Sequence, residues 1–211
     1  MYRISTSSLQ SIYAPSAKRK SEDDSKASFS EYLDCAREET EDISSVPTDW
    51  AAGGIWYLYD ALTAVREYMR NELGIDPDDR TFTHEITEEQ REWLASRHDM
   101  DSVETAAVGS EEFANFMADL YYLGVFSSSD VMNFERVDIP TENGLIYLGE
   151  DWNYDSPDPN SSAVEYTLSL IEYETRLLDC LEDPAERQRF QDSINYRQEL
   201  NDVLQNIFNS F

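Results

Sequence analysis

The feature that most restricts the fold of this chain is an uncharged stretch at residues 51–59 that leads into a strongly patterned helix. Apolar residues recur three or four positions apart, which predicts a helix over residues 49–73 with one apolar face. Trp56 and Tyr59 add a second apolar face. Because a helix that is apolar on two faces must be covered by other elements, we expect it to lie at the centre of the fold. The residues of the first face are Ile55, Leu58, Leu62, Val65, Met69 and Leu73.

The charge of the chain restricts its partners. The formal net charge is −28, from 44 acidic and 16 basic side chains in 211 residues. All lysines lie within the first 26 residues, so every later basic side chain is an arginine. Such a surface repels nucleic acid and anionic membranes, because both would bring phosphates against carboxylates. We therefore expect no direct nucleic-acid binding, no membrane partner, and a protein partner that is basic. The alternative is that the charge only keeps the protein soluble or adapts it to a salty cytoplasm.

The cysteines suggest a reducing compartment. Cys35 and Cys180 are the only two, and they lie too far apart to form a disulfide framework. Both fall in amphipathic patterns, where a free cysteine usually packs as a small hydrophobic residue. The N-terminus has serines where a secretory signal would have an apolar core, and no run approaches the roughly 18 apolar residues of a membrane span. The expected location is the cytoplasm.

The chain divides into two expected regions. Residues 1–28 are rich in serine, carry the basic triplet Lys18-Arg19-Lys20 and show no sustained periodicity, which predicts a flexible tail. This composition is similar to that of the unfolded N-termini used by signal-less export systems, so a recognition segment is the alternative. Residues 29–211 are expected to form an acidic, mostly helical domain.

Start and stop signals predict about six or seven helices in this domain. The last two are expected to form an antiparallel αα-hairpin. Besides the central helix, the predicted helices cover residues 29–41, 87–97 with a cap at Thr87, 110–124 with a cap at Ser110, 129–134, a segment opened by the capping box of Ser162 and Glu165, and a segment opened by Asp183-Pro184.

One small β-hairpin is expected near residues 134–148. Asn143-Gly144 lies between two apolar runs, and both residues accept the positive φ of a two-residue hairpin turn. A polar loop is predicted to follow at residues 149–161. The predicted fold class is therefore mainly α, a single-domain helical bundle with a C-terminal αα-hairpin and this one β-hairpin.

The metal candidate is a calcium loop within the polar segment. Asp151, Asn153 and Asp155 stand at positions 1, 3 and 5 of an EF-hand-like loop. The pattern then breaks, because Ser156 replaces the glycine of the sharp turn and Ser162 replaces the bidentate glutamate. An ordinary loop that caps the next helix is the alternative.

Catalytic motifs are missing from the sequence. It contains no Gly-x-Ser-x-Gly elbow, no Gly-x-Gly-x-x-Gly motif and no phosphate-binding loop that ends in Gly-Lys-Ser/Thr. His84 and His98 lack the partners of a zinc site and are expected to be ordinary surface or half-buried histidines. Acidic pairs are so frequent that none of them points to catalysis. We expect neither an enzyme nor a bound cofactor.

Trp152 and Tyr154 are the expected partner contacts, because they lie in a polar loop whereas aromatic residues at helical spacing usually belong to a core. The resulting hypothesis is a non-enzymatic interaction module or adaptor that binds its partner through an acidic helical surface. Three alternatives remain: a nucleic-acid mimic that inhibits a DNA-binding protein, a signal-less export substrate or effector, and a hydrolase or metal protein. The αα-hairpin could also offer an apolar stripe to a second copy and form a homodimer.

Overall fold

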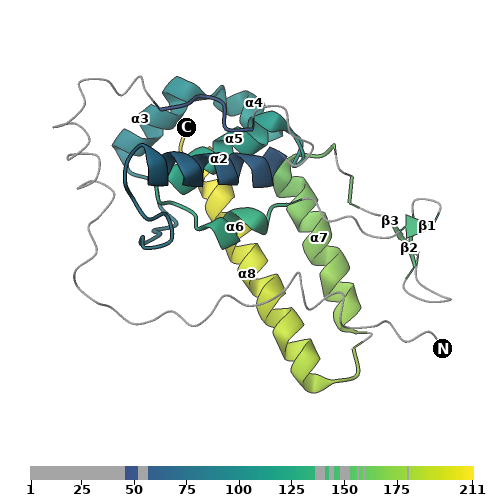
Figure 1. Cartoon of the computed structure of the whole chain (residues 1–211). Helices are drawn as coiled ribbons and strands as arrows, with labels where there is room; N and C mark the ends of the chain where they lie inside the picture. The colour runs from purple at the N-terminus through teal and green to yellow at the C-terminus, as the bar shows by residue number, and fades with distance from the viewer. Residues whose placement is uncertain are drawn as a thin grey trace.

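The computed structural model describes residues 46–51, 57–135, 141–142, 145–147, 153–155, 157–158, 160–179 and 181–211, and this part of the chain is mainly helical (Figure 1). The tail predicted at 1–28, the helix predicted at 29–41 and both cysteines lie outside the described residues. Among the helices described, none combines the length and the apolar character needed to cross a membrane.

The helix start signals in the sequence are confirmed at four helices. Thr87 and Ser110 cap α3 and α5 by accepting a hydrogen bond from a backbone N–H in the first turn. Ser162 forms the predicted capping box of α7, and Asp183 caps α8 directly before Pro184. The helices are α2 (Tyr57–Asn71), α3 (Glu88–Arg97), α4 (Met100–Thr105), α5 (Glu111–Tyr122), α6 (Ser128–Met132), α7 (Ala163–Leu178) and α8 (Pro184–Phe208).

Two short helices differ from the prediction. The N-cap of α6 is Ser127 and not Ser129, because the Ser127 hydroxyl accepts from the backbone N–H of Asp130 and the Asp130 side chain accepts in return. The sequence does not predict α4, since six residues are too few to show a helical period. Its N-cap, Asp99, makes no side-chain capping hydrogen bond.

The most deeply buried helix is α5, and the prediction that α2 is central is wrong. From Phe113 to Tyr122 nearly every residue of α5 is buried, whereas α2 buries a single face against it. Tyr59, one of the two residues of the second apolar face expected of α2, is 58% exposed and is not buried by other elements. A tyrosine can remain at the surface because its hydroxyl is solvated. Trp56 lies outside the described residues.

One apolar core joins α2, α5, α6 and the C-terminal half of α8. Phe116 of α5 stacks on Phe208 of α8 with 5.4 Å between ring centroids. Phe126 and Phe134, on either side of α6, pack at 6.0 Å. These aromatic contacts attach the last turns of the chain to its middle.

The helices α7 and α8 pack side by side, and their joined ends project from the rest of the molecule (Figure 1). The first turns of α8 are accordingly exposed, while Leu200 and Leu204 further along are fully buried. Between the two helices, Arg197 Nε lies 3.4 Å from a carboxylate oxygen of Glu174, and both residues are buried. Arg197 also donates to the carbonyl of Asn133, so one buried arginine connects α7, α8 and the end of α6.

Three short strands form an antiparallel sheet in the order β1-β2-β3. Ile146 pairs with Thr141 on one side and with Tyr154 on the other. The turn at Asn143-Gly144 lies outside the described residues, and the predicted β-hairpin stays a prediction. Residues 153–155 were expected in a loop but pair with β2, which keeps their backbone extended. The strands are β1 (Thr141–Glu142), β2 (Leu145–Tyr147) and β3 (Asn153–Asp155).

The loop between α2 and α3 runs along the end of α5. The backbone N–H groups of Thr83 and His84 donate to the carbonyl oxygens of Gly124 and Val125 at 3.1 and 3.0 Å. Gly124 has a φ of +75°, and a Cβ added there would lie 2.9 Å from the guanidinium of Arg80. A glycine therefore lets the end of α5 turn beneath this loop.

Candidate functional site

A buried carboxylate in α5 is the centre of the candidate site. Ser110 begins the helix, and Glu111 and Glu112 stand in its first turn, where acidic side chains interact favourably with the helix dipole. The residues that follow face the core, and Asp119 lies among them with 0% of its surface exposed. Because a lone charge in an apolar interior is very costly, Asp119 needs partners that stabilise it.

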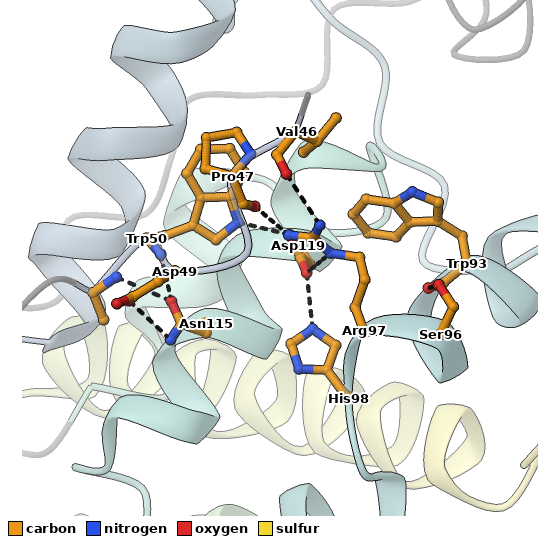
Figure 2. Close-up of polar contacts among 11 residues, drawn as sticks. Val46, Pro47, Asp49, Trp50, Trp93, Ser96, Arg97, His98, Asn115 and Asp119 are labelled. Atoms are coloured by element: carbon orange, nitrogen blue, oxygen red, sulfur yellow. Dashed lines mark hydrogen bonds and ion pairs between the residues drawn. The ribbon is translucent and has the colours of Figure 1, made fainter. Parts of the chain in front are cut away.

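Asp119 has three such partners (Figure 2). Arg97, the last residue of α3, donates from Nε to Oδ2 at 2.8 Å and from Nη2 to Oδ1 at 3.2 Å. The next residue, His98, places its Nε2 2.8 Å from the same Oδ2, so the tautomer that fits carries its proton on Nε2. The indole Nε1 of Trp50 donates to Oδ1 at 2.6 Å. Each carboxylate oxygen therefore accepts two hydrogen bonds.

The same site holds the backbone of residues 46–51, which we call the strap (Figure 2). Besides Asp119, Arg97 binds the carbonyl oxygens of the first two strap residues. Asn115, one turn before Asp119 on α5, accepts from the backbone N–H groups of the last two strap residues, at 2.7 and 3.0 Å. Side chains, rather than a sheet ladder or a helix, thus attach the strap to α3 and α5.

Aromatic side chains enclose the ring of Trp50, which is 3% exposed. Tyr68 of α2 contacts it edge-on at 5.6 Å, and Tyr122 of α5 lies at 6.3 Å. Trp93 of α3 stacks on Tyr122 at 5.8 Å, and the guanidinium of Arg97 lies 4.4 Å from the centroid of the Trp93 ring. Burial raises the pKa of the Tyr122 phenol to about 12. The indole therefore occupies a buried aromatic environment with one strong polar contact.

In this arrangement the polar groups of the site hold the strap, and the carboxylate of Asp119 has no lone pair directed at a substrate position. A general base needs a lone pair that faces a substrate, whereas both oxygens of Asp119 already accept two hydrogen bonds. The side chain of His98 is only 7% exposed and turns its Nε2 to that carboxylate. In the part of the chain that the structure describes, no group of three or more His, Cys, Asp and Glu side chains is placed to hold a metal ion.

A second buried aspartate also pairs with a histidine. Oδ2 of Asp130, in α6, lies 3.0 Å from His84 Nε2 and accepts from the backbone N–H of Ser127 at 2.7 Å. The hydroxyl of Tyr196 in α8 donates to Oδ1. His84 has a φ of +58°, which is uncommon for a residue with a side chain, and its contact with Asp130 helps to hold that conformation. Both histidines, expected to be ordinary, are thus partners of buried carboxylates.

The hydrogen bonds of Asp130 predict a loss of stability in acid. Burial alone would raise the pKa of the carboxyl, but the hydrogen bonds from His84, Tyr196 and Ser127 outweigh burial and hold the pKa below its ordinary value. A lowered folded-state pKa contributes stability above the unfolded value of about 3.9, and this contribution is lost as the pH falls through the folded value. Asp130→Asn should therefore lose about 2 kcal/mol near pH 7, and its deficit against the wild type should shrink below about pH 4.

Urea unfolding of both proteins from pH 3 to pH 7 measures this difference in the free energy of unfolding. A difference of about 1.4 kcal/mol corresponds to a tenfold change in the unfolding equilibrium constant. The matched control is Asp158→Asn, which changes an exposed aspartate outside any helix. A deficit of Asp130→Asn that stays constant over the whole range would contradict the assignment of the acid-sensitive charge to Asp130.

The residues predicted as a site are only partly within the described chain. Asp151 and Trp152 lie outside it. Asn153, Tyr154 and Asp155 form β3, of which the structure describes the backbone alone. The calcium loop and the aromatic contact patch therefore both stay predictions.

The sequence analysis did not predict the residues of the Asp119 site. One usable signal exists, since Asp119 is the only charged residue in the otherwise uncharged run 113–126. A lone acid in such a run must be buried with a partner or must mark an exposed face. The identity of the partners is not readable in this way, because Trp50 is 69 positions away and Arg97 is 22.

Comparison of the chain with protein-family models, with curated proteins and with solved structures found no match.

Proposed function

We propose that this chain is a non-enzymatic protein-interaction module that binds a basic protein through the outer surface of α3, α4 and the start of α5. The observation that carries the proposal is that this segment exposes nine acidic side chains, whereas its two arginines are bonded to other groups of the protein. We call these exposed residues the acidic surface. They are Glu85, Glu88, Glu89, Glu92, Asp99, Asp101, Glu104, Glu111 and Glu112.

The basic side chains of residues 85–112 are used within the protein. Arg91 pairs with Glu88 and donates to the carbonyl of Ser210 at 2.8 Å. Arg97 and its neighbour His98 both bind the buried Asp119. The segment contains no other basic residue, so its nine acidic side chains outnumber its two arginines and its formal charge is strongly negative.

Charge of this kind favours a particular class of partner. It accelerates encounter with basic surfaces, and the effect weakens as salt screens the charges. The same charge disfavours nucleic acid and anionic membranes. We also propose a cytoplasmic setting, because the two cysteines lie far apart in the sequence and suit a reducing compartment.

Neutralising four acids of the acidic surface should weaken partner binding. The variant carries Glu85→Gln, Glu92→Gln, Asp101→Asn and Glu104→Gln, which are all exposed. Each exposed charge pair contributes about 0.2–1 kcal/mol, so the loss of four should lower affinity about tenfold or more. The measurement is affinity capture from a lysate of the source organism at low and high salt, followed by titration of the retained protein.

The matched control neutralises four exposed acids of α8 and the connection before it, changing the net charge equally. These substitutions are Glu182→Gln, Asp192→Asn, Glu199→Gln and Asp202→Asn. The proposal expects the control to keep the partner and high salt to release it. Equal binding by all three proteins, or binding that ignores ionic strength, would contradict it. Competition by double-stranded DNA for the retained protein would instead favour nucleic-acid mimicry.

A further inference from the structure

The strap is bound in the way that proteins bind short peptides. Among the described residues, Arg97 donates hydrogen bonds to two consecutive carbonyls of the strap, and the side-chain oxygen of Asn115 accepts from two consecutive N–H groups of the strap. In peptide-binding sites, hydrogen bonds to the main chain likewise supply affinity, and a pocket for one side chain supplies specificity. Here that side chain is Trp50.

The contacts define which residues of the strap are recognised. Trp50 and Ala51 are buried, whereas Thr48 and Asp49 are exposed. A phenylalanine at position 50 could fill the aromatic enclosure but could not donate to Asp119, which accepts from the indole at 2.6 Å. The site is therefore selective for tryptophan followed by a small residue, and tolerant at the two positions before the tryptophan.

We propose that the surface formed by Arg97, Asn115 and Asp119 is a binding site for an extended tryptophan-containing peptide, and that residues 46–51 are its built-in occupant. A segment whose backbone is bound by side chains, as the strap is among the described residues, can be replaced by another segment that presents the same backbone and indole. The ligand class in trans is an extended peptide with the pattern Pro-x-x-Trp-Ala. The residues of this site are not those of the acidic surface. The peptide-binding proposal and the proposal that the acidic surface binds a basic protein can therefore be tested independently.

The first test uses the full chain carrying Trp50→Ala, which removes the indole from the site. The probe is a synthetic peptide of residues 44–53, and the matched controls are the same peptide with tryptophan replaced by phenylalanine or alanine. We expect the unmodified peptide to bind and to raise the Tm of the variant in proportion to its concentration. The phenylalanine peptide should bind about tenfold more weakly, and the alanine peptide should not bind measurably.

A comparison with the wild-type chain tests whether the strap and the added peptide compete for the same site. The wild-type chain should bind the peptide far more weakly than the Trp50→Ala variant, because its own strap competes at a high effective concentration. Adding Asn115→Ala to the variant should weaken the peptide further through the lost backbone contacts. Absence of binding at about millimolar peptide, or equal binding of the three peptides, would overturn the proposal.

A second test remains decisive if Trp50→Ala does not fold. A protease recognition sequence is inserted between Gly53 and Gly54 of the full chain, which is then cleaved after folding. We expect the fragment that ends at the cleavage site to stay bound to the remainder during size-exclusion chromatography. An excess of free peptide of residues 44–53 should displace this fragment from the remainder. Immediate separation of the fragments, or retention that the peptide does not affect, would overturn the proposal.

Discussion

Replacing Asp119 with asparagine should reduce the free energy of unfolding by about 4 kcal/mol. The carboxylate is fully buried and balances the guanidinium of Arg97, whose side chain is 10% exposed. Removing one charge of a buried pair leaves the other uncompensated, at a cost of about 3–5 kcal/mol. An asparagine also replaces one carboxylate oxygen by an N–H₂ group, which opposes the donor from Trp50 at the Oδ1 position or that from His98 at the Oδ2 position. Urea unfolding followed by circular dichroism measures the loss.

Two comparisons make this result specific. Asp101→Asn removes an exposed charge on α4 and should change stability by less than about 0.5 kcal/mol. Tryptophan fluorescence in Asp119→Asn should also change, because the indole of Trp50 loses its carboxylate partner. A loss of stability below about 1 kcal/mol would show that Asp119 does not anchor the site as a charged group.

The second large effect is expected at the buried ion pair between α7 and α8. Arg197→Met should cost about 3 kcal/mol or more, because it leaves the carboxylate of Glu174 buried beside an apolar chain and removes a donor from the carbonyl of Asn133. Glu174→Met should cost a similar amount for the opposite reason. The double variant should be more stable than the sum of the two losses predicts, because no unbalanced charge remains. Thermal and urea unfolding of all four proteins measure the coupling.

An exposed pair on the same helix is the control. Arg176 and Glu172 lie four positions apart on α7 at 2.6 Å and are both partly exposed. Breaking such a pair should cost only about 0.3–0.5 kcal/mol. Strict additivity of the two substitutions at Glu174 and Arg197 would show that these residues do not stabilise each other.

The starts of α3, α5, α7 and α8 were predictable because their signals are local, whereas residues 49–51, predicted to begin the helix of residues 49–73, lie in the strap and are not helical. Thr87 and Ser162 each meet a partner three residues away, so the capping boxes of α3 and α7 can be read directly from the sequence. The same holds for Asp183-Pro184 at the start of α8. Helix α4 has neither a capping hydrogen bond nor enough length for a period, and it was not predictable by these means.

The depth of each helix was less predictable than its position. Uncharged residues before α2 suggested a central helix, but Tyr59 is exposed and α5 occupies the interior instead. An apolar pattern states which face must be buried but does not state how much of the helix other elements cover. Which helix is buried most deeply depends on tertiary packing, here on the stacking of Phe208 of the last helix on Phe116 of α5.

The candidate site depends on contacts between distant parts of the sequence. Asp119 could be recognised as an isolated acid in an uncharged run, but its bonds to Trp50 and Arg97 exist only after α3 and the strap pack on α5. His98 has the same limitation, because nothing adjacent to it in the sequence indicates a buried carboxylate. Long-range pairing of polar groups is therefore the part of this protein that pattern analysis could not supply.

The most direct test of the central claim, that Asp119 and Asn115 hold the strap on the helices, is hydrogen exchange at Trp50 measured by NMR. The indole N–H resonance of Trp50 can be assigned by its disappearance in Trp50→Phe. The account predicts that this proton and the backbone N–H of Ala51 exchange about a hundredfold or more slowly than in an unfolded chain, and that Asn115→Ala accelerates exchange at Ala51. Exchange of both protons at the unfolded-chain rate in the wild-type protein would contradict the claim.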